Sequence, residues 1–129
     1  MAFCQGIHHI AIICSDYAQS KQFYTQVLGC AVVRETYRAE RQSYKLDLRL
    51  ADGIQIELFS FPHPPPRPSQ PEARGLRHLA LVVEDLEAAI EYLHACQVTT
   101  EEIRLDELTG KRFVFFQDPD QLPIELYER

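Results

Sequence analysis

Two histidine–glutamate pairs recur at nearly the same spacing in the two halves of the chain. His9 precedes His78 by 69 residues, and Glu57 precedes Glu125 by 68. Two imidazoles and two carboxylates form a donor set that suits Zn, Ni, Mn, Co or Fe and leaves positions for water or substrate in an octahedral shell. A closed structural site would more often use cysteine. The repeat therefore predicts one divalent metal ion bound by His9, Glu57, His78 and Glu125.

The choice of His9 over its neighbour His8 follows from the repeated segment around it. HIAIICSD, beginning at His9, aligns with HLALVVED, beginning at His78. Successive side chains of a strand point to opposite faces, so His8 and His9 do not share one. Arg77 aligns with His8, whereas a histidine aligns with His9. A single histidine on a strand is more often a core or surface residue than a ligand. The metal prediction therefore depends on the recurrence of both the histidine and the glutamate in the two halves of the chain.

The two glutamates lie inside apolar segments that also repeat. DGIQIEL, which contains Glu57, aligns with DQLPIEL, which contains Glu125. A lone buried carboxylate costs several kcal/mol unless it is paired or neutralised. A shared cation would offset this cost at both positions, although a glutamate on an edge strand can also simply be solvated. The remaining histidines, His63 in a proline-rich segment and His94 on a predicted helix, are expected on solvated faces outside the site.

Hydrophobic periodicity predicts the elements that position these side chains in the first half. A β-branched apolar run over residues 7–14 indicates a buried strand. Ser15 or Asp16 is expected to cap a helix that runs to about Leu28, where Gly29 ends it. Strands are predicted over 31–36, 43–50 and 54–60, the last two joined by a tight turn at 51–53.

The second half repeats this order after a proline-rich connector. Six of the eight prolines lie between Pro62 and Pro71, which indicates a stiff linker, with a lid or a partner-docking segment as the alternative. A strand over 77–83, a helix capped by Asp85 and strands over 98–105, 112–117 and 122–128 are then predicted, with a turn at 118–121. The fold class is α+β, with two βαβββ modules, about 6–61 and 76–129, forming a curved eight-stranded mixed sheet in one domain.

Composition is typical of a globular protein. The 129 residues are 46% hydrophobic and 25% charged, and the net charge of -6 is spread along the chain. No Lys/Arg cluster favours nucleic acid. No apolar run approaches the roughly 18 residues of a membrane span, and the N-terminus lacks the pattern of a signal peptide, so a cytoplasmic location is expected. The cysteines, Cys4, Cys14, Cys30 and Cys96, show no CxxC spacing and are predicted to be reduced structural thiols.

Together these motifs resemble the vicinal oxygen chelate superfamily of glyoxalase I-like metalloproteins. The resemblance covers essentially the whole chain and suggests a small bacterial glyoxalase-like subgroup. Its opening module is matched by His9, Ser15-Asp16, Phe23-Tyr24 and Val27-Leu28-Gly29. Its closing module is matched by the RFVFFQDPD segment from Arg112 to Asp120 and by Ile124-Glu125-Leu126. One departure is Gln121, where the family usually has glycine.

The resemblance implies that paired modules curl into a cup around one divalent ion, with His9, Glu57, His78 and Glu125 as its ligands. Retention of all four ligands is the pattern of glyoxalase I, whereas ring-cleaving dioxygenases and fosfomycin-modifying enzymes use two histidines and one glutamate. The chain's basic residues match no glutathione-binding motif. The resemblance also implies a homodimer, whose cup is built from one chain or from modules exchanged between two.

The expected function is a metal-dependent lyase or isomerase of the glyoxalase type, acting on a 2-oxoaldehyde adduct or a related hydroxycarbonyl. The ion would bind two vicinal oxygens of this small-molecule substrate and stabilise an enediolate-like charge. Glu57 or Glu125 would act as the general base. Two alternatives remain open: another metalloenzyme of the same scaffold (an epimerase, a dioxygenase or an antibiotic-modifying thiol transferase), or a protein that sequesters a small molecule without turnover.

Overall fold

The computed structural model describes residues 2–129 and contains the eight strands and two main helices in the predicted order. The chain divides into two compact units, the first ending at Pro65 and the second beginning at Pro66. Each unit has the βαβββ order and one four-stranded mixed sheet. The predicted fold class is thus confirmed, with the eight strands placed in two sheets.

The first unit holds a sheet with the strand order β1-β4-β3-β2. β1 (His9–Cys14) pairs in parallel with β4 (Gln55–Ser60). β3 (Ser43–Arg49) pairs antiparallel with β4 on one side and with β2 (Ala31–Arg38) on the other. α1 (Tyr17–Gln22) continues into a π-helical turn, η1 (Phe23–Val27), and a short 3₁₀ turn, η2 (Ala39–Arg41), connects β2 to β3.

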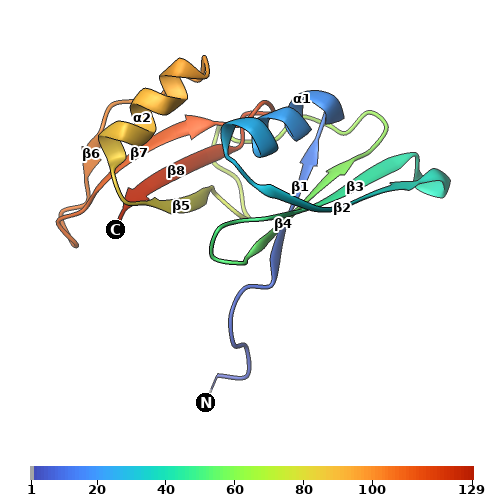
Figure 1. Ribbon diagram of the computed structural model, residues 1–129, viewed down its shortest axis with the longest axis horizontal. Coiled ribbons are helices and arrows are strands. Elements are labelled where there is room, and N and C mark those ends of the chain that lie inside the picture. The colour runs from blue at the N-terminus through green and yellow to red at the C-terminus, as the bar shows by residue number, and fades with distance from the viewer. Residues whose placement is uncertain (1) are drawn as a thin grey trace. The chain divides into compact units, whose positions relative to one another are not determined.

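Local sequence signals explain the helix of this unit. The Asp16 carboxylate accepts a hydrogen bond from the Gln19 backbone N–H at 3.1 Å, as an N-cap residue should. Gly29 follows with φ of +73°, a left-handed conformation that glycine adopts without steric cost. The helical segment covers one face of the sheet (Figure 1). On that face lie the fully buried Leu46, Leu48, Ile56 and Leu58, so the other face is left for polar side chains.

The second unit repeats the arrangement, with the strand order β5-β8-β7-β6. β5 (Leu79–Val83) runs parallel to β8 (Pro123–Glu128), and β7 (Arg112–Gln117) pairs antiparallel with β8 and with β6 (Arg104–Leu105). Asp85 caps α2 (Leu86–Ala95) through the Ala88 N–H at 3.0 Å. α2 lies over the sheet face that carries buried Val114, Phe116, Ile124 and Leu126 (Figure 1).

The strand predicted over 98–105 is wrong in its length, because only Arg104 and Leu105 form β6. Before them a single backbone hydrogen bond, from the Glu101 N–H to the Phe115 carbonyl, ties the chain to β7. After them the chain turns back at once, and the Asp106 N–H donates to the Lys111 carbonyl. An edge strand has neighbours on one side only, so its extent depends on this pairing and not on its own apolar pattern.

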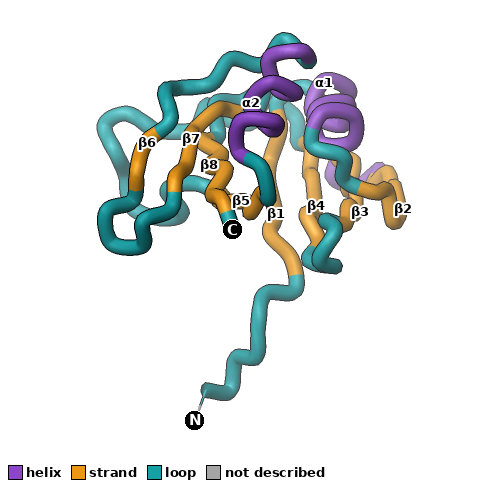
Figure 2. Tube along the Cα trace, turned by 60° about the vertical axis from the view of Figure 1, so that its left-hand side comes forward, coloured by secondary structure: helices purple, strands orange, loops and turns teal. Residues whose placement is uncertain are grey.

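The proline-rich connector forms no helix or strand in the described residues between β4 and β5 (Figure 2). Arg67 organises its second part, because the guanidinium donates to the carbonyls of Leu76 and Arg77 at 2.8 and 3.0 Å. No helix within residues 2–129 is long and apolar enough to cross a membrane. The cysteines are free thiols, and Cys14 and Cys30 are buried.

Candidate metal centre

In the first unit, His9 and Glu57 face each other on the sheet side opposite to the leucine core. Ala11 of β1 lies in register with Glu57 of β4, so His9, two residues earlier on β1, projects from the same face. His9 Nδ1 is 3.5 Å from Glu57 Oε2. The Glu57 side chain is only 13% exposed. The first predicted pair, His9 and Glu57, is therefore within ion-pair distance.

The second unit brings His78 and Glu125 together in the same way. Ala80 of β5 is in register with Glu125 of β8, and His78 lies two residues before Ala80. The His78 Nε2 and Glu125 Oε2 atoms are 3.9 Å apart, and the Glu125 side chain is also 13% exposed. Across residues 2–129, no three His, Cys, Asp or Glu side chains gather closely enough to hold an ion, and the predicted ligands form one His–Glu pair in each unit.

His63 and His94 are exposed, as expected, whereas His8 lies beside His9, with the two Nδ1 atoms 2.9 Å apart. His8 contacts the His9 ring edge-on, and the ion pair with Glu57 is made by His9. The His8 carbonyl accepts the Gln55 N–H, which extends the pairing of β1 with β4. His63 is exposed, and His94 is exposed on α2 with its ring bonded to Thr100 at 3.0 Å.

Charged residues surround Glu57, and sequence reasoning did not assign them to the site. Asp47 of β3 lies directly opposite Glu57 and is buried, with 8% of its surface exposed. Lys45 Nζ lies 3.1 Å from Asp47 Oδ1 and 3.8 Å from Glu57 Oε1. Their alternation with Leu46 and Leu48 is a period-2 signal that could have placed both on the site face.

Aromatic residues surround Glu125 instead. Phe115 occupies the position opposite Glu125, equivalent to that of Asp47, and Phe113 occupies the position equivalent to that of Lys45. The His78 ring meets Phe115 edge-on, with centroids 5.0 Å apart. Phe113 stacks on Tyr127. Equivalent positions in the two units thus carry two charges in one sheet and two phenyl rings in the other.

Tyr127 is held in place from the edge of this aromatic group. Its hydroxyl donates to Asp106 Oδ2 at 2.9 Å and also contacts the Thr109 hydroxyl. The hydrogen bond from Tyr127 is the main reason why the pKa of the Asp106 carboxyl lies below its usual value. The turn that follows β6 is thereby tied to β8 on the side that carries Glu125.

Each unit also places one arginine over two phenylalanine rings on the same face as its His–Glu pair. Arg38 Cζ lies 4.8 Å from the centroid of Phe59 and 5.6 Å from that of Phe61. Arg104 Cζ lies 5.4 Å and 5.1 Å from the centroids of Phe113 and Phe115. These distances are those of cation–π contacts. Sequence reasoning missed both arginines, because the signal is the repeat of an arginine with paired aromatics rather than a motif.

The donor set fits a divalent metal ion. Imidazole and carboxylate are common ligands of Zn, Ni, Mn, Co and Fe. In the described part of the chain, His78 is the one cationic group within ion-pair distance of Glu125, and it carries charge only when protonated. A mostly buried carboxylate with so little compensation favours a cation beside it. His9, Glu57, His78 and Glu125 are therefore the residues that could hold the ion.

Three relatives resemble the chain over nearly its whole length. The uncharacterized protein YwkD of Bacillus subtilis is 62% identical over 97% of this chain and 98% of its own. The uncharacterized protein YaeR of Escherichia coli is 57% identical over 95% of each chain. The crystal structure of a glyoxalase family protein from Enterococcus faecalis superposes with a TM-score of 0.92 at 47% identity, covering 98% of this chain and 100% of that one.

The family assignment rests on the same span of sequence. Residues 6–126 match the family described as the Glyoxalase/Bleomycin resistance protein/Dioxygenase superfamily. This span contains both His–Glu pairs and both βαβββ modules except the last two residues of β8. The chain belongs to the Glyoxalase/Bleomycin resistance protein/Dioxygenase superfamily, the vicinal oxygen chelate proteins.

Proposed function

We propose that the protein is a metal-dependent lyase or isomerase of the glyoxalase I type, acting on a 2-oxoaldehyde adduct or a related small hydroxycarbonyl. The observation that carries this proposal is the recurrence of a His–Glu pair at contact distance on equivalent strands of both units. Membership of a superfamily that includes glyoxalases supports it. All four residues, His9, Glu57, His78 and Glu125, would hold one divalent ion.

The chain's own residues suggest how a proton would be moved. When bound, the ion would supply Lewis-acid stabilisation of negative charge on two vicinal oxygens of the substrate. Glu57 lies 3.5 Å from His9 and 3.8 Å from Lys45, whereas within residues 2–129 the one ion pair of Glu125 is with His78 at 3.9 Å. A carboxylate held by fewer ion pairs is freer to reach a substrate proton. Glu125 is therefore the proposed general base, and Glu57 the more firmly held ligand.

Aromatic side chains of the second unit would exclude water from this proton transfer. Phe115 lies opposite Glu125 and against His78, and it is 8% exposed. Removing water strengthens electrostatic interactions at the reacting atoms and limits side reactions. Phe115 would therefore shield the proposed base, Glu125, from water and would take no part in the proton transfer itself.

Metal analysis of protein purified without chelator tests the ligand set. One divalent ion per chain is expected in the unaltered protein and in His94→Ala, a control at an exposed histidine. His9→Ala and His78→Ala should lose the ion. Unchanged metal content in both of these variants would overturn the assignment.

Turnover then separates this function from its competitors. With Ni or Zn added back, the protein should convert a hemithioacetal of methylglyoxal, and Glu57→Gln and Glu125→Gln should abolish the activity. Oxygen consumption with Fe(II) and a catechol would instead indicate a dioxygenase. Tight binding of a small molecule by a protein that never retains metal would indicate sequestration.

A homodimer is also proposed, on the family resemblance. Both His–Glu pairs are needed for one ion, and they can come from one chain or from modules exchanged between two. Light scattering should give twice the chain mass of 14.9 kDa. A monomeric mass at micromolar concentration would contradict the proposal.

A further inference from the structure

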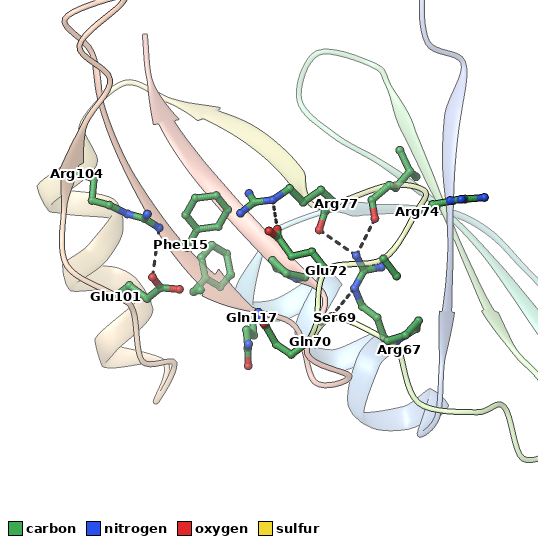
Figure 3. A pocket seen from close by; sticks show the side chains of 15 residues that line it. Arg67, Ser69, Gln70, Glu72, Arg74, Arg77, Glu101, Arg104, Phe115 and Gln117 are labelled. Carbon is green, nitrogen blue, oxygen red and sulfur yellow. Dashed lines mark hydrogen bonds and ion pairs between the residues drawn. The ribbon is translucent and has the colours of Figure 1, made fainter.

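The second unit contains a cavity between its proline-rich segment and the part of the sheet where β7 ends and β8 begins. Its volume is about 520 Å³, and residues 67–77 form one wall. Phe115, Phe116, Gln117 and Pro123 of β7 and β8 form another (Figure 3). The charged residues that line it are four arginines and two glutamates, Arg67, Arg74, Arg77, Arg104, Glu72 and Glu101. The cavity therefore has an excess of two positive charges in a chain whose net charge is -6.

One of these arginines is fully used in shaping the wall. Arg67 donates to the Ser69 hydroxyl at 2.8 Å and to the backbone carbonyls of Leu76 and Arg77. These bonds fold the segment into a loop whose end carries Arg77 to the cavity. Arg77 in turn pairs with Glu72, and its Nη1 atom lies 3.3 Å from His78 Nδ1.

The Arg104 guanidinium is placed so that it can bind an anionic ligand. Its stacking over Phe113 and Phe115 holds the planar group against the aromatic surface. Among the described residues its one ion pair is with Glu101 at 3.3 Å, and the two side chains are 54% and 63% exposed. Such an exposed pair contributes little stability, so an anion with two oxygens can replace it at small cost.

The cavity adjoins the His78–Glu125 pair within the same unit. In Figure 3, Phe115 lies between the guanidinium groups of Arg104 and Arg77. Phe115 also lies opposite Glu125 and contacts the His78 ring. A molecule held by these arginines would therefore have its other end near the proposed base.

We infer that this cavity binds an anionic group, a carboxylate or a phosphate, and that the substrate of the proposed reaction is an anionic hydroxycarbonyl. The link to substrate rests on the proposed function, whereas the anion site itself does not. Two guanidinium groups flanking an aromatic floor suit an anion with several oxygens attached to a short carbon chain. A neutral hydroxycarbonyl would offer these guanidinium groups no charge and would leave them paired with Glu72 and Glu101.

Calorimetric binding of 3-phosphoglycerate, an unreactive hydroxy acid that carries both anionic groups, tests the inference. Binding is expected with the full chain as purified and again after chelator treatment, with glycerol as the neutral comparison. Arg104→Gln should weaken the binding about tenfold or more, since hydrogen bonds to charged groups are worth about 1.5–3 kcal/mol. Arg77→Gln should weaken it similarly. Arg41→Gln, which removes the same charge from an exposed turn of the first unit, should leave it unchanged.

The outcomes separate this inference from the proposed function. Binding of 3-phosphoglycerate that Arg104→Gln and Arg41→Gln affect equally, or that glycerol matches, overturns the anion site. Absence of any binding overturns it as well. Because the measurement is repeated without metal, it does not depend on the result of the metal analysis. Loss of metal in the histidine variants together with unaltered anion binding in Arg104→Gln would keep the metal proposal and reject this one.

Discussion

Replacement of Lys45 by methionine should tighten metal binding, because it removes a positive charge beside a proposed ligand. Lys45 Nζ lies 3.8 Å from Glu57 Oε1. Methionine keeps the apolar stem of the side chain and removes only the ammonium group. A divalent ion bound at Glu57 would be repelled by that ammonium, so its loss lowers the Kd. An ion bound elsewhere would not respond.

The distance sets the size of this effect. An ion bound to Glu57 Oε1 through a metal–oxygen bond of about 2 Å would lie at most about 6 Å from Lys45 Nζ. A double and a single positive charge at that distance repel by about 1.4 kcal/mol in bulk water, or about tenfold in Kd. An effective dielectric constant of about 40 raises the repulsion to about 2.8 kcal/mol, or about a hundredfold. Lys45 is 32% exposed, so a value between these two is expected.

Competition with a chromophoric chelator would measure the Kd for Ni and Zn at fixed ionic strength. Lys21→Met is the matched control, because Lys21 also pairs with a glutamate, Glu35 at 2.8 Å, but on α1 and away from the site face. Asp47→Asn should shift the Kd in the opposite direction, since it removes a negative charge and frees Lys45 to approach Glu57. A Kd for Lys45→Met within twofold of the unaltered protein would refute the placement of the ion at Glu57.

Three further variants test the fold and its thiols. Asp118→Ala should lower the free energy of unfolding in urea by about 2–4 kcal/mol, since Asp118 is 5% exposed and its carboxylate accepts two backbone N–H groups at 2.8 and 2.9 Å; a loss below about 0.5 kcal/mol would contradict this. Gln121→Gly should raise the melting temperature slightly, because Gln121 has a left-handed φ of +65° that costs a non-glycine residue about 1 kcal/mol; a lower melting temperature would argue against it. Burial raises the pKa of the Cys30 thiol to about 11, so a thiol reagent at pH 8 should modify exposed Cys4 rapidly and Cys30 only after unfolding. Cys4→Ser should remove the rapid phase, and its persistence would contradict the assignment.

Much of the fold could be predicted because its signals are local. Asp16 and Asp85 each cap a helix through a hydrogen bond to a backbone N–H three residues later, a contact that needs no tertiary information. The short β6 could not be predicted, because its length depends on which N–H and carbonyl groups β7 presents across the sheet. The π-helical turn over Phe23–Val27 is likewise absent from the apolar periodicity, which is nearly the same for an α-helix.

The candidate site likewise has features that could be predicted from the sequence and features that depend on tertiary contacts. Repetition identified each His–Glu pair, since two modules with one register place equivalent residues at equivalent points of their sheets. No repeat in the sequence predicted the contacts around these pairs. Alternation assigns Lys45 and Asp47 to a face, but the approach of the ammonium to Glu57 depends on a side-chain conformation that the sequence does not encode in any short pattern.

The two half-sites are alike in their ligands and unlike in their neighbours, and that difference bears on how they work. Asp47 and Phe115 each lie opposite a glutamate in the same register, so the backbone imposes the same geometry on both. If these positions only filled space, an apolar residue would serve at either of them. Instead one glutamate lies beside a lysine that also pairs with an aspartate, and the other lies among aromatic rings beside a cavity with excess positive charge. The first arrangement holds a carboxylate by ion pairs to both a histidine and a lysine, and the second pairs one with a histidine alone, which is why we propose Glu125, among the four ligands, as the base.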